Sequence, residues 1–356
     1  MNLSFLFEPV EESFLDKHAE PLTIGSVVST TVEQFSSYDL ALFTVCETKQ
    51  AEAIREVFYT LKKTNNNWNI VDLGTLAPIE DQQEQVDRVT EIMRLCLEAK
   101  VIPIVIGTDN LLAYAQYAAY TILGRGISYT NIDAFFDLLT TDQLTNQSYL
   151  YKILTHTEAN LKSYAHLAYQ SYLVPQEYID AFEKFSFEKY RLGELRKDIT
   201  YVEPTLRASD LVSLDLSAIT RLQATASKDS VVFGLDADEA CQLAWYAGNG
   251  DQVSSFGVYG FEEIDNNTSE IIATAIWYFI EGFYHRKDHL DFESQDYIKY
   301  AVLVSDVEII FYKSTFTSKW WMKISDSSVL PCAYEDYEQA SGGEIPDRWI
   351  LFQQRD

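Results

Sequence analysis

The sequence predicts an α/β protein with a three-layer, doubly wound and mostly parallel sheet, followed by a C-terminal antiparallel extension. Two patterns support this prediction. Short runs of apolar, β-branched and aromatic residues alternate with longer segments whose apolar residues recur every three or four positions, which is typical of repeated strand–helix–strand units. Towards the C-terminus, closely spaced apolar runs are separated only by short polar turns, which indicates a meander of antiparallel strands.

Seven apolar runs are expected to form strands, because strands buried on both faces are apolar along most of their length. They span residues 39–47, 68–74, 101–107, 127–136, 167–174, 210–219 and 254–261. The expected helices span residues 51–63, 83–99, 111–123 and 236–248. No Pro-, Gly- or Ser-rich linker divides the chain, so we expect one domain over residues 1–356, with the meander at about 295–356.

The net charge of −27, from 54 acidic and 27 basic residues, limits the classes of partner. A surface of this sign repels phosphate backbones and anionic lipid. The densest basic stretch, 191–197, itself contains Glu194. We therefore expect neither a nucleic-acid-binding nor a membrane-surface protein.

The cysteines and the apolar stretches indicate the compartment. Four cysteines occur singly, at Cys46, Cys96, Cys241 and Cys332, as is usual for reduced core thiols. The first residues lack the basic and apolar segments of a secretion signal. The longest apolar stretch, 271–280, is shorter than the ~20 residues of a membrane helix. We expect a cytoplasmic protein without a membrane span.

Polar side chains follow several of the predicted strands. In an open α/β sheet, ligands bind beyond the carboxyl ends of the strands, so residues just after these runs are candidates for a site. They are Asp109 and Asn110, Asp133 and Asp137, and Asp215 and Ser217.

Three segments carry these residues in order: GTDN (107–110), DAFFD (133–137) and SLDLS (213–217). They resemble the signatures Gly-Gly-Asp-His, Asp-Ala-His-x-Asp and Ser-x-Asp-x-Asp of the ureohydrolase family of arginase, agmatinase and formimidoylglutamase. The segment 234–248 resembles the stretch that follows the third signature. Each signature is short, so the ordered set over about 107–260 carries the resemblance, which implies an arginase-like fold.

The resemblance implies a role for each matching residue. In this family two Mn²⁺ ions, about 3.5–4 Å apart as in other two-metal sites, share a hydroxide that attacks a guanidinium or amidine carbon. Asp133 and Asp215 match the two aspartates that bridge both ions. Asp137 matches an aspartate of the first ion, and Asn110 stands where its histidine is expected.

The departures from the family pattern affect mainly the second ion. Phe135 and Ser217 occupy the positions of its own histidine and aspartate, and a phenyl ring cannot bind a metal. Gly260 stands where family members have a glutamate that grips the guanidinium. We therefore expect no two-manganese centre.

The remaining candidates, Asn110, Asp133, Asp137 and Asp215, offer only oxygen ligands, which suit one divalent cation: Mn²⁺, Mg²⁺ or Ca²⁺. Without a cation, protonation or a basic neighbour must neutralise three converging aspartates. A vestigial cleft, hydrogen-bonded to backbone and water, is the alternative.

Two functional hypotheses follow. The first is a catalytically impaired or inactive ureohydrolase-like protein with a binding or regulatory role. The second is an active hydrolase of C–N bonds in amidines or guanidines that uses a single oxygen-ligated cation. In either case the ligand expected from the resemblance is a small amidine or guanidine. Because ureohydrolases commonly form trimers and hexamers, a homo-oligomer is expected.

Overall fold

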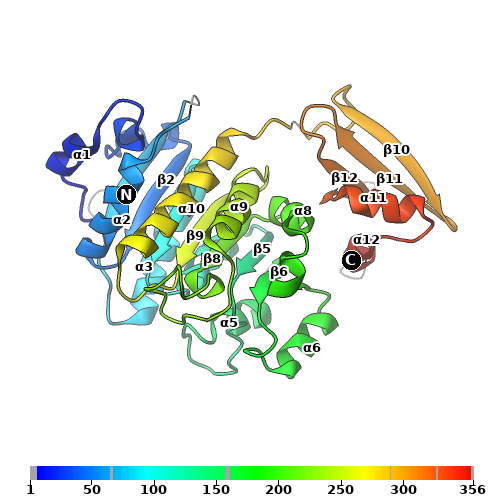
Figure 1. The fold of residues 1–356 in the computed structure, drawn as a ribbon, viewed down its shortest axis with the longest axis horizontal. Helices are drawn as coiled ribbons and strands as arrows, with labels where there is room; N and C mark the ends of the chain where they lie inside the picture. The colour runs from blue at the N-terminus through cyan, green and yellow to red at the C-terminus, as the bar shows by residue number, and fades with distance from the viewer. Residues whose placement is uncertain (1–5, 65–66, 157–160, 289, 326–327, 354–356) are drawn as a thin grey trace.

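The computed structural model describes residues 6–64, 67–156, 161–288, 290–325 and 328–353, and within these ranges it contains a nine-stranded sheet and a separate four-stranded sheet (Figure 1). Every strand pairing in the larger sheet is parallel. In spatial order its strands are β1 (Val28–Ser29), β3 (Ile70–Leu76), β2 (Leu40–Val45), β4 (Ile102–Gly107), β9 (Ser255–Tyr259), β8 (Leu211–Asp215), β5 (Ile127–Ile132), β6 (Leu161–Tyr169) and β7 (Glu188–Arg191). The predicted fold class is confirmed.

Helices cover both faces of this sheet and bury its apolar side chains. One core contains the inner sides of α2 (Thr48–Thr60), α7 (Leu192–Leu195), α8 (Glu203–Arg207), α9 (Ala237–Gly248) and α10 (Asn266–Tyr284). The core on the opposite face contains α3 (Gln82–Ala99), α4 (Leu112–Ile122), α5 (Tyr149–Thr155) and α6 (Gln176–Lys184). A short helix, α1 (Glu12–His18), packs beside α2 through Phe14 and Tyr59. The result is the expected three-layer arrangement.

Local sequence explains where two of these helices begin. The Asp81 carboxylate accepts hydrogen bonds from the backbone N–H groups of Gln83 and Glu84 at the start of α3. Asp236 and Glu239 form a capping box at the start of α9. Side-chain oxygens at these positions satisfy N–H groups that have no partner within the helix, so both predicted helices begin close to the expected residues.

The prediction for β6 was wrong in position. The expected strand at 167–174 overlaps the observed one, Leu161–Tyr169, by only three residues. The strand contains polar residues whose burial is compensated by hydrogen bonds: His166 Nδ1 lies 2.8 Å from the Tyr164 hydroxyl, and its Nε2 lies 3.1 Å from the Asp133 carbonyl oxygen. Because the contact with Asp133 depends on the neighbouring strand β5, the apolar pattern alone placed the strand too late. The expected strands at 127–136 and 210–219 are also shorter, and end at Ile132 and Asp215.

The four-stranded sheet forms an appendage at one end of the larger sheet (Figure 1). Its antiparallel strands are β10 (Tyr297–Val304), β11 (Val307–Ser314), β12 (Trp320–Ser325) and β13 (Ser328–Cys332). The predicted meander is correct over this range but wrong beyond Cys332, where α11 (Tyr334–Ser341) and α12 (Asp347–Gln353) follow. These helices pack on one face of the small sheet, which explains the apolar residues that continue past β13.

Charged side chains connect the appendage to the main sheet. The Arg207 guanidinium at the end of α8 donates from Nη2 to the Trp320 carbonyl oxygen at 3.0 Å and lies over the Trp321 ring. Arg348 of α12 donates from Nη1 to Thr205 Oγ1 at 2.9 Å and forms an ion pair with Glu188 at 3.4 Å. These contacts fix the small sheet against α8 and β7. That residues 1–356 form one domain stays a prediction.

Within the described ranges, none of the helices combines the length and the apolar character that crossing a membrane requires. All four cysteines are buried and free, as predicted.

Candidate functional site

The ends of three strands bring the predicted polar residues together. Strands β5 and β8 are parallel neighbours, with Ile132 opposite Leu214. The next residue after each, Asp133 and Asp215, therefore lies at the same edge of the sheet. Asn110 lies between β4 and α4, and its Nδ2 donates a hydrogen bond to Asp137 Oδ2 at 2.8 Å. Residues more than a hundred positions apart thus form one cluster, called the acidic cluster below: Asn110, Asp133, Asp137 and Asp215.

Ser217 connects the two aspartates of adjacent strands. Its hydroxyl donates to Asp133 Oδ1 at 2.6 Å, and its backbone N–H donates to Asp215 Oδ1 at 2.8 Å. Asp133 Oδ1 also accepts from the backbone N–H of Phe135 at 2.9 Å. One oxygen of each carboxylate is therefore occupied by donors of the protein itself.

The other oxygen of Asp133, Oδ2, is buried and accepts no hydrogen bond from the N–H or hydroxyl groups of the described residues. The carboxyls of Asp133 and Asp137 interact by a hydrogen bond, which requires a proton on one of them. Burial raises the pKa of the Asp133 carboxyl to about 6. Burial, together with the charge of Asp133, also raises the pKa values of Asp137 and Asp215 well above the ordinary range. A buried carboxylate without a compensating charge favours its neutral form, so this cluster requires either protons or a cation.

No basic side chain in the described part of the chain supplies that charge. None of the three aspartates of the acidic cluster forms an ion pair within these ranges. Lys228 lies near the cluster, but its Nζ is 3.3 Å from Oδ2 of Asp109. A basic neighbour, one of the three alternatives left open by the sequence, is therefore not what neutralises the cluster.

Gly260 lies directly against the Asp215 carboxylate. It has a φ of +89°, and a Cβ at this position would lie 2.5 Å from Asp215 Oδ1 and 2.7 Å from Oδ2. Such a contact is shorter than real side chains show, so any larger residue at 260 would displace the Asp215 carboxylate. A glutamate at this position is incompatible with the observed place of Asp215.

The residues present do not fit a two-manganese centre. Phe135 offers no ligand atom, the Ser217 hydroxyl is bound to Asp133 rather than free, and Asn110 directs its N–H group at Asp137. Among the residues that the structure describes, no three His, Cys, Asp or Glu side chains are arranged as a metal-binding group. The unpartnered Oδ2 of Asp133 and the raised pKa values of the three aspartates leave room for a single cation.

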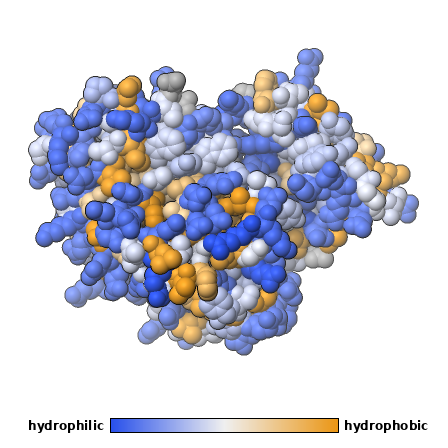
Figure 2. Space-filling model, viewed as in Figure 1, coloured by the Kyte–Doolittle hydropathy of each residue, from blue (hydrophilic) through white to orange (hydrophobic). Residues whose placement is uncertain are grey.

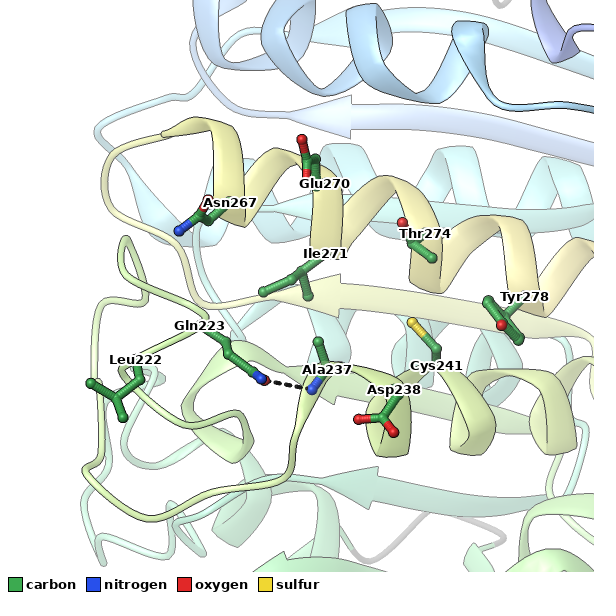
Figure 3. A pocket seen from close by; sticks show the side chains of 10 residues that line it. All are labelled: Leu222, Gln223, Ala237, Asp238, Cys241, Asn267, Glu270, Ile271, Thr274 and Tyr278. Carbon is green, nitrogen blue, oxygen red and sulfur yellow. Dashed lines mark hydrogen bonds between the residues drawn. The ribbon is translucent and has the colours of Figure 1, made fainter.

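Two hollows near these strand ends were not predicted. One, of about 410 Å³, lies between α9 and α10; Cys241 and Ile271 lie on the sides of the two helices that face each other (Figure 3). On this face hydrophobic side chains reach the surface among hydrophilic ones (Figure 2). The other, of about 510 Å³, adjoins Phe135. Because separate helices or loops line each hollow, no local sequence signal could have revealed them.

Comparisons with known proteins agree with this geometry. The sequence profile described as the Arginase family matches residues 47–280, a range that contains the entire acidic cluster. No curated protein matches the sequence significantly.

Solved structures share the fold. The chain is similar to formiminoglutamase of Trypanosoma cruzi with Mn²⁺ (TM-score 0.65, 16% identity), and the match covers 72% of this chain and 97% of that one. For formimidoylglutamase of Bacillus subtilis the TM-score is 0.65 and the sequence identity is 15%, and the match covers 74% of this chain and 92% of that one. For agmatine ureohydrolase of Thermoplasma volcanium the TM-score is 0.60 and the sequence identity is 17%, and the match covers 76% of this chain and 98% of that one. At these identities the likeness concerns the fold alone.

Proposed function

Since this chain belongs to the arginase family, we propose that it retains the fold and the location of the family's site but not the two-metal hydrolysis, and that it acts by binding. The proposal concerns the carboxyl edge of β4, β5 and β8, where the acidic cluster lies. We further propose that it acts in the cytoplasm as a homo-oligomer.

The observation that carries this proposal is the bond from the Ser217 hydroxyl to Asp133 Oδ1 at 2.6 Å. In a two-metal site, Asp133 would use its oxygens to bridge the ions, and position 217 would supply a further carboxylate. Here a neutral hydroxyl at 217 uses one of those oxygens as a hydrogen-bond acceptor. Phe135 beside it leaves the second ion with no ligand of its own.

Activity assays test this proposal directly. The purified protein with Mn²⁺ is incubated with arginine, agmatine or formimidoylglutamate, and release of urea, ammonia or formamide is measured. We expect no turnover above the rate without protein. Manganese-dependent product formation from any of the three would overturn the proposal.

A restoration experiment tests the assignment of residues. The double variant Phe135→His with Ser217→Asp supplies the two ligands that the second ion lacks. Calorimetric titration with Mn²⁺ should then show two ions per chain, against at most one for the unchanged protein. The matched control is Phe135→His with Ser217→Asn, which has nearly the same size but no charge and should bind no second ion. Equal stoichiometry in the two variants would contradict the assignment.

The unpartnered Asp133 Oδ2 favours a second candidate function, a hydrolase with one cation. Asp133, Asp137 and Asp215 would hold this ion, with the amide oxygen of Asn110 after rotation of its side chain. A cation there would polarise a water molecule for attack on an amidine or guanidinium carbon. Turnover that depends on one bound ion and is lost in Asp133→Asn would support this candidate against the first.

A further inference from the structure

The hollow of about 510 Å³ beside Phe135 is built from loops that follow three adjacent strands. Phe135 comes from the loop after β5, Tyr172 and Leu173 from the loop after β6, and Arg221 from the loop after β8. The segment 230–233, which precedes α9, closes it. This is the edge where open α/β sheets bind ligands, and the volume lies within the range of about 300–1,000 Å³ that is usual for small-molecule pockets.

The lining is apolar although most of it is open to solvent. Tyr172, Val232 and Phe233 are 65%, 56% and 64% exposed. Large apolar side chains at the surface are ordinary when scattered, but a group of them around one hollow indicates a binding site. We call the lining residues Phe135, Tyr172, Leu173, Val232 and Phe233 the apolar pocket.

Hydrogen bonds to its carbonyl oxygens hold the segment 230–233 in place. Thr220 Oγ1 donates to the Val232 carbonyl oxygen at 3.0 Å, and the side-chain amide of Gln170 donates to the carbonyl oxygen of Phe233. The backbone N–H of Arg221 donates to the Val231 carbonyl oxygen at 2.7 Å. The wall is therefore tied to the loops after β6 and β8, and the hollow is a preformed feature of the fold.

Arg221 is the charged side chain of the lining. Among the described residues its guanidinium donates to Ser230 alone, from Nε to Oγ at 3.0 Å and from Nη2 to the carbonyl oxygen at 2.8 Å. Within the described ranges it has no carboxylate partner, in a chain with twice as many acidic as basic residues. None of the lining residues is acidic. The pocket thus combines an apolar surface with one cation whose charge is not neutralised.

We propose that the apolar pocket binds a small amphipathic carboxylate, with its aromatic or aliphatic body against Phe135, Val232 and Phe233 and its carboxylate on Arg221. This inference rests on the proposed binding role and gives it a ligand class. A guanidinium or amidine, the ligand expected from the sequence, is disfavoured here because Arg221 repels a cation and no lining carboxylate attracts one. Arginine is well suited to the anion, since its planar N–H groups match the two carboxylate oxygens.

Three probes with the same body test the charge preference: 4-phenylbutyrate, 4-phenylbutylamine and 4-phenylbutanol. Binding to the full chain is measured by calorimetry at low ionic strength. We expect the acid to bind about tenfold more tightly than the amine, a difference of about 1.4 kcal/mol, with the alcohol between them. Equal or tighter binding of the amine would overturn the proposal, as would no binding of the acid.

Two variants locate the site. Arg221→Gln should remove the difference between acid and amine while the alcohol binds as before. Phe233→Ser should weaken all three probes. Phe316→Ser is the matched control, because Phe316 is 66% exposed but lies in the appendage, and it should leave binding unchanged. Acid binding that is indifferent to Arg221→Gln and Phe233→Ser would overturn the proposal.

The alternative to a small ligand on this surface is a second copy of the chain. The ligand proposal would be overturned in favour of an interface if sedimentation shows an oligomer that dissociates in Phe233→Ser but not in Phe316→Ser, and if no probe binds. Failure of the ligand proposal is distinguishable from failure of the proposed function. Product release from arginine, agmatine or formimidoylglutamate would refute the loss of hydrolysis whether or not the probes bind.

Discussion

Replacing Gly260 by alanine is expected to destabilise the protein more than any ordinary glycine-to-alanine change, because two costs coincide. The first is conformational: φ is +89°, a region that costs a residue with a Cβ about 1–2 kcal/mol. The second is steric, because the new Cβ would lie 2.5 Å from Asp215 Oδ1. The carboxylate must move and lose the 2.8 Å hydrogen bond from the Ser217 backbone.

The steric cost follows from that hydrogen bond. Burial raises the pKa of the Asp215 carboxyl, so in the cation-free protein this group accepts the bond in its neutral form, and such a hydrogen bond contributes about 0.5–1.5 kcal/mol. Together with the conformational cost, Gly260→Ala should lower the free energy of unfolding by roughly 2–3 kcal/mol. Urea denaturation followed by circular dichroism measures this difference.

Control variants separate the two costs. Gly343 has a φ of +92° and Gly124 a φ of +62°, and a Cβ at either would have nothing within 4 Å. Alanine at these positions should cost only the conformational part. In an Asp215→Ala background, Gly260→Ala should also cost no more than these controls, because the colliding carboxylate is gone. A cost for Gly260→Ala equal to that for Gly343→Ala in the unchanged protein would refute the reasoning.

Three further predictions concern buried polar groups. Burial raises the pKa of Asp133 from 3.8 to about 6, so the stability that this group contributes is complete below pH 3.8 and is lost as the pH rises through about 6. In urea denaturation the metal-free protein should therefore become less stable over this pH range. Asp133→Asn should flatten the pH dependence. Burial also raises the pKa values of all four cysteine thiols, so a thiol reagent should modify none of them in the folded protein and all four in denaturant. Arg55 donates to both oxygens of buried Asp72, at 2.8 and 2.9 Å. Arg55→Met should therefore cost about 3–5 kcal/mol by leaving that carboxylate unpaired, and the same change in an Asp72→Leu background should cost much less; equal costs would contradict the pairing.

The sequence alone determined the strands that are buried on both faces. Strands β2, β4 and β9 lie in the middle of the sheet and are buried on both faces, so a continuous apolar run identifies each of them. The acidic cluster was also predictable, because the carboxyl ends of parallel strands meet at one edge. Asp133, Asp137 and Asp215 could be selected from the sequence since each follows such a run.

Only the tertiary structure decided which contacts these residues form with one another. The sequence indicates that Ser217 is not a carboxylate, but its bond to Asp133 depends on the neighbouring strands β5 and β8. The place of Gly260 against Asp215 likewise follows from the pairing of β8 with β9. These contacts join residues far apart in the chain, and they are set by distances of a few tenths of an ångström that no local pattern encodes.

The apolar pocket shows the same limit most clearly. Tyr172, Arg221 and Phe233 lie on three loops, and each alone is an ordinary exposed residue. Periodicity reports which face of a strand or helix is buried, because that face repeats; a loop has no repeat, and its neighbours are fixed by long-range packing. The sequence therefore specified the sheet and the edge at which the acidic cluster lies, and the folding of the loops over that edge decided the shape and charge of the hollow there.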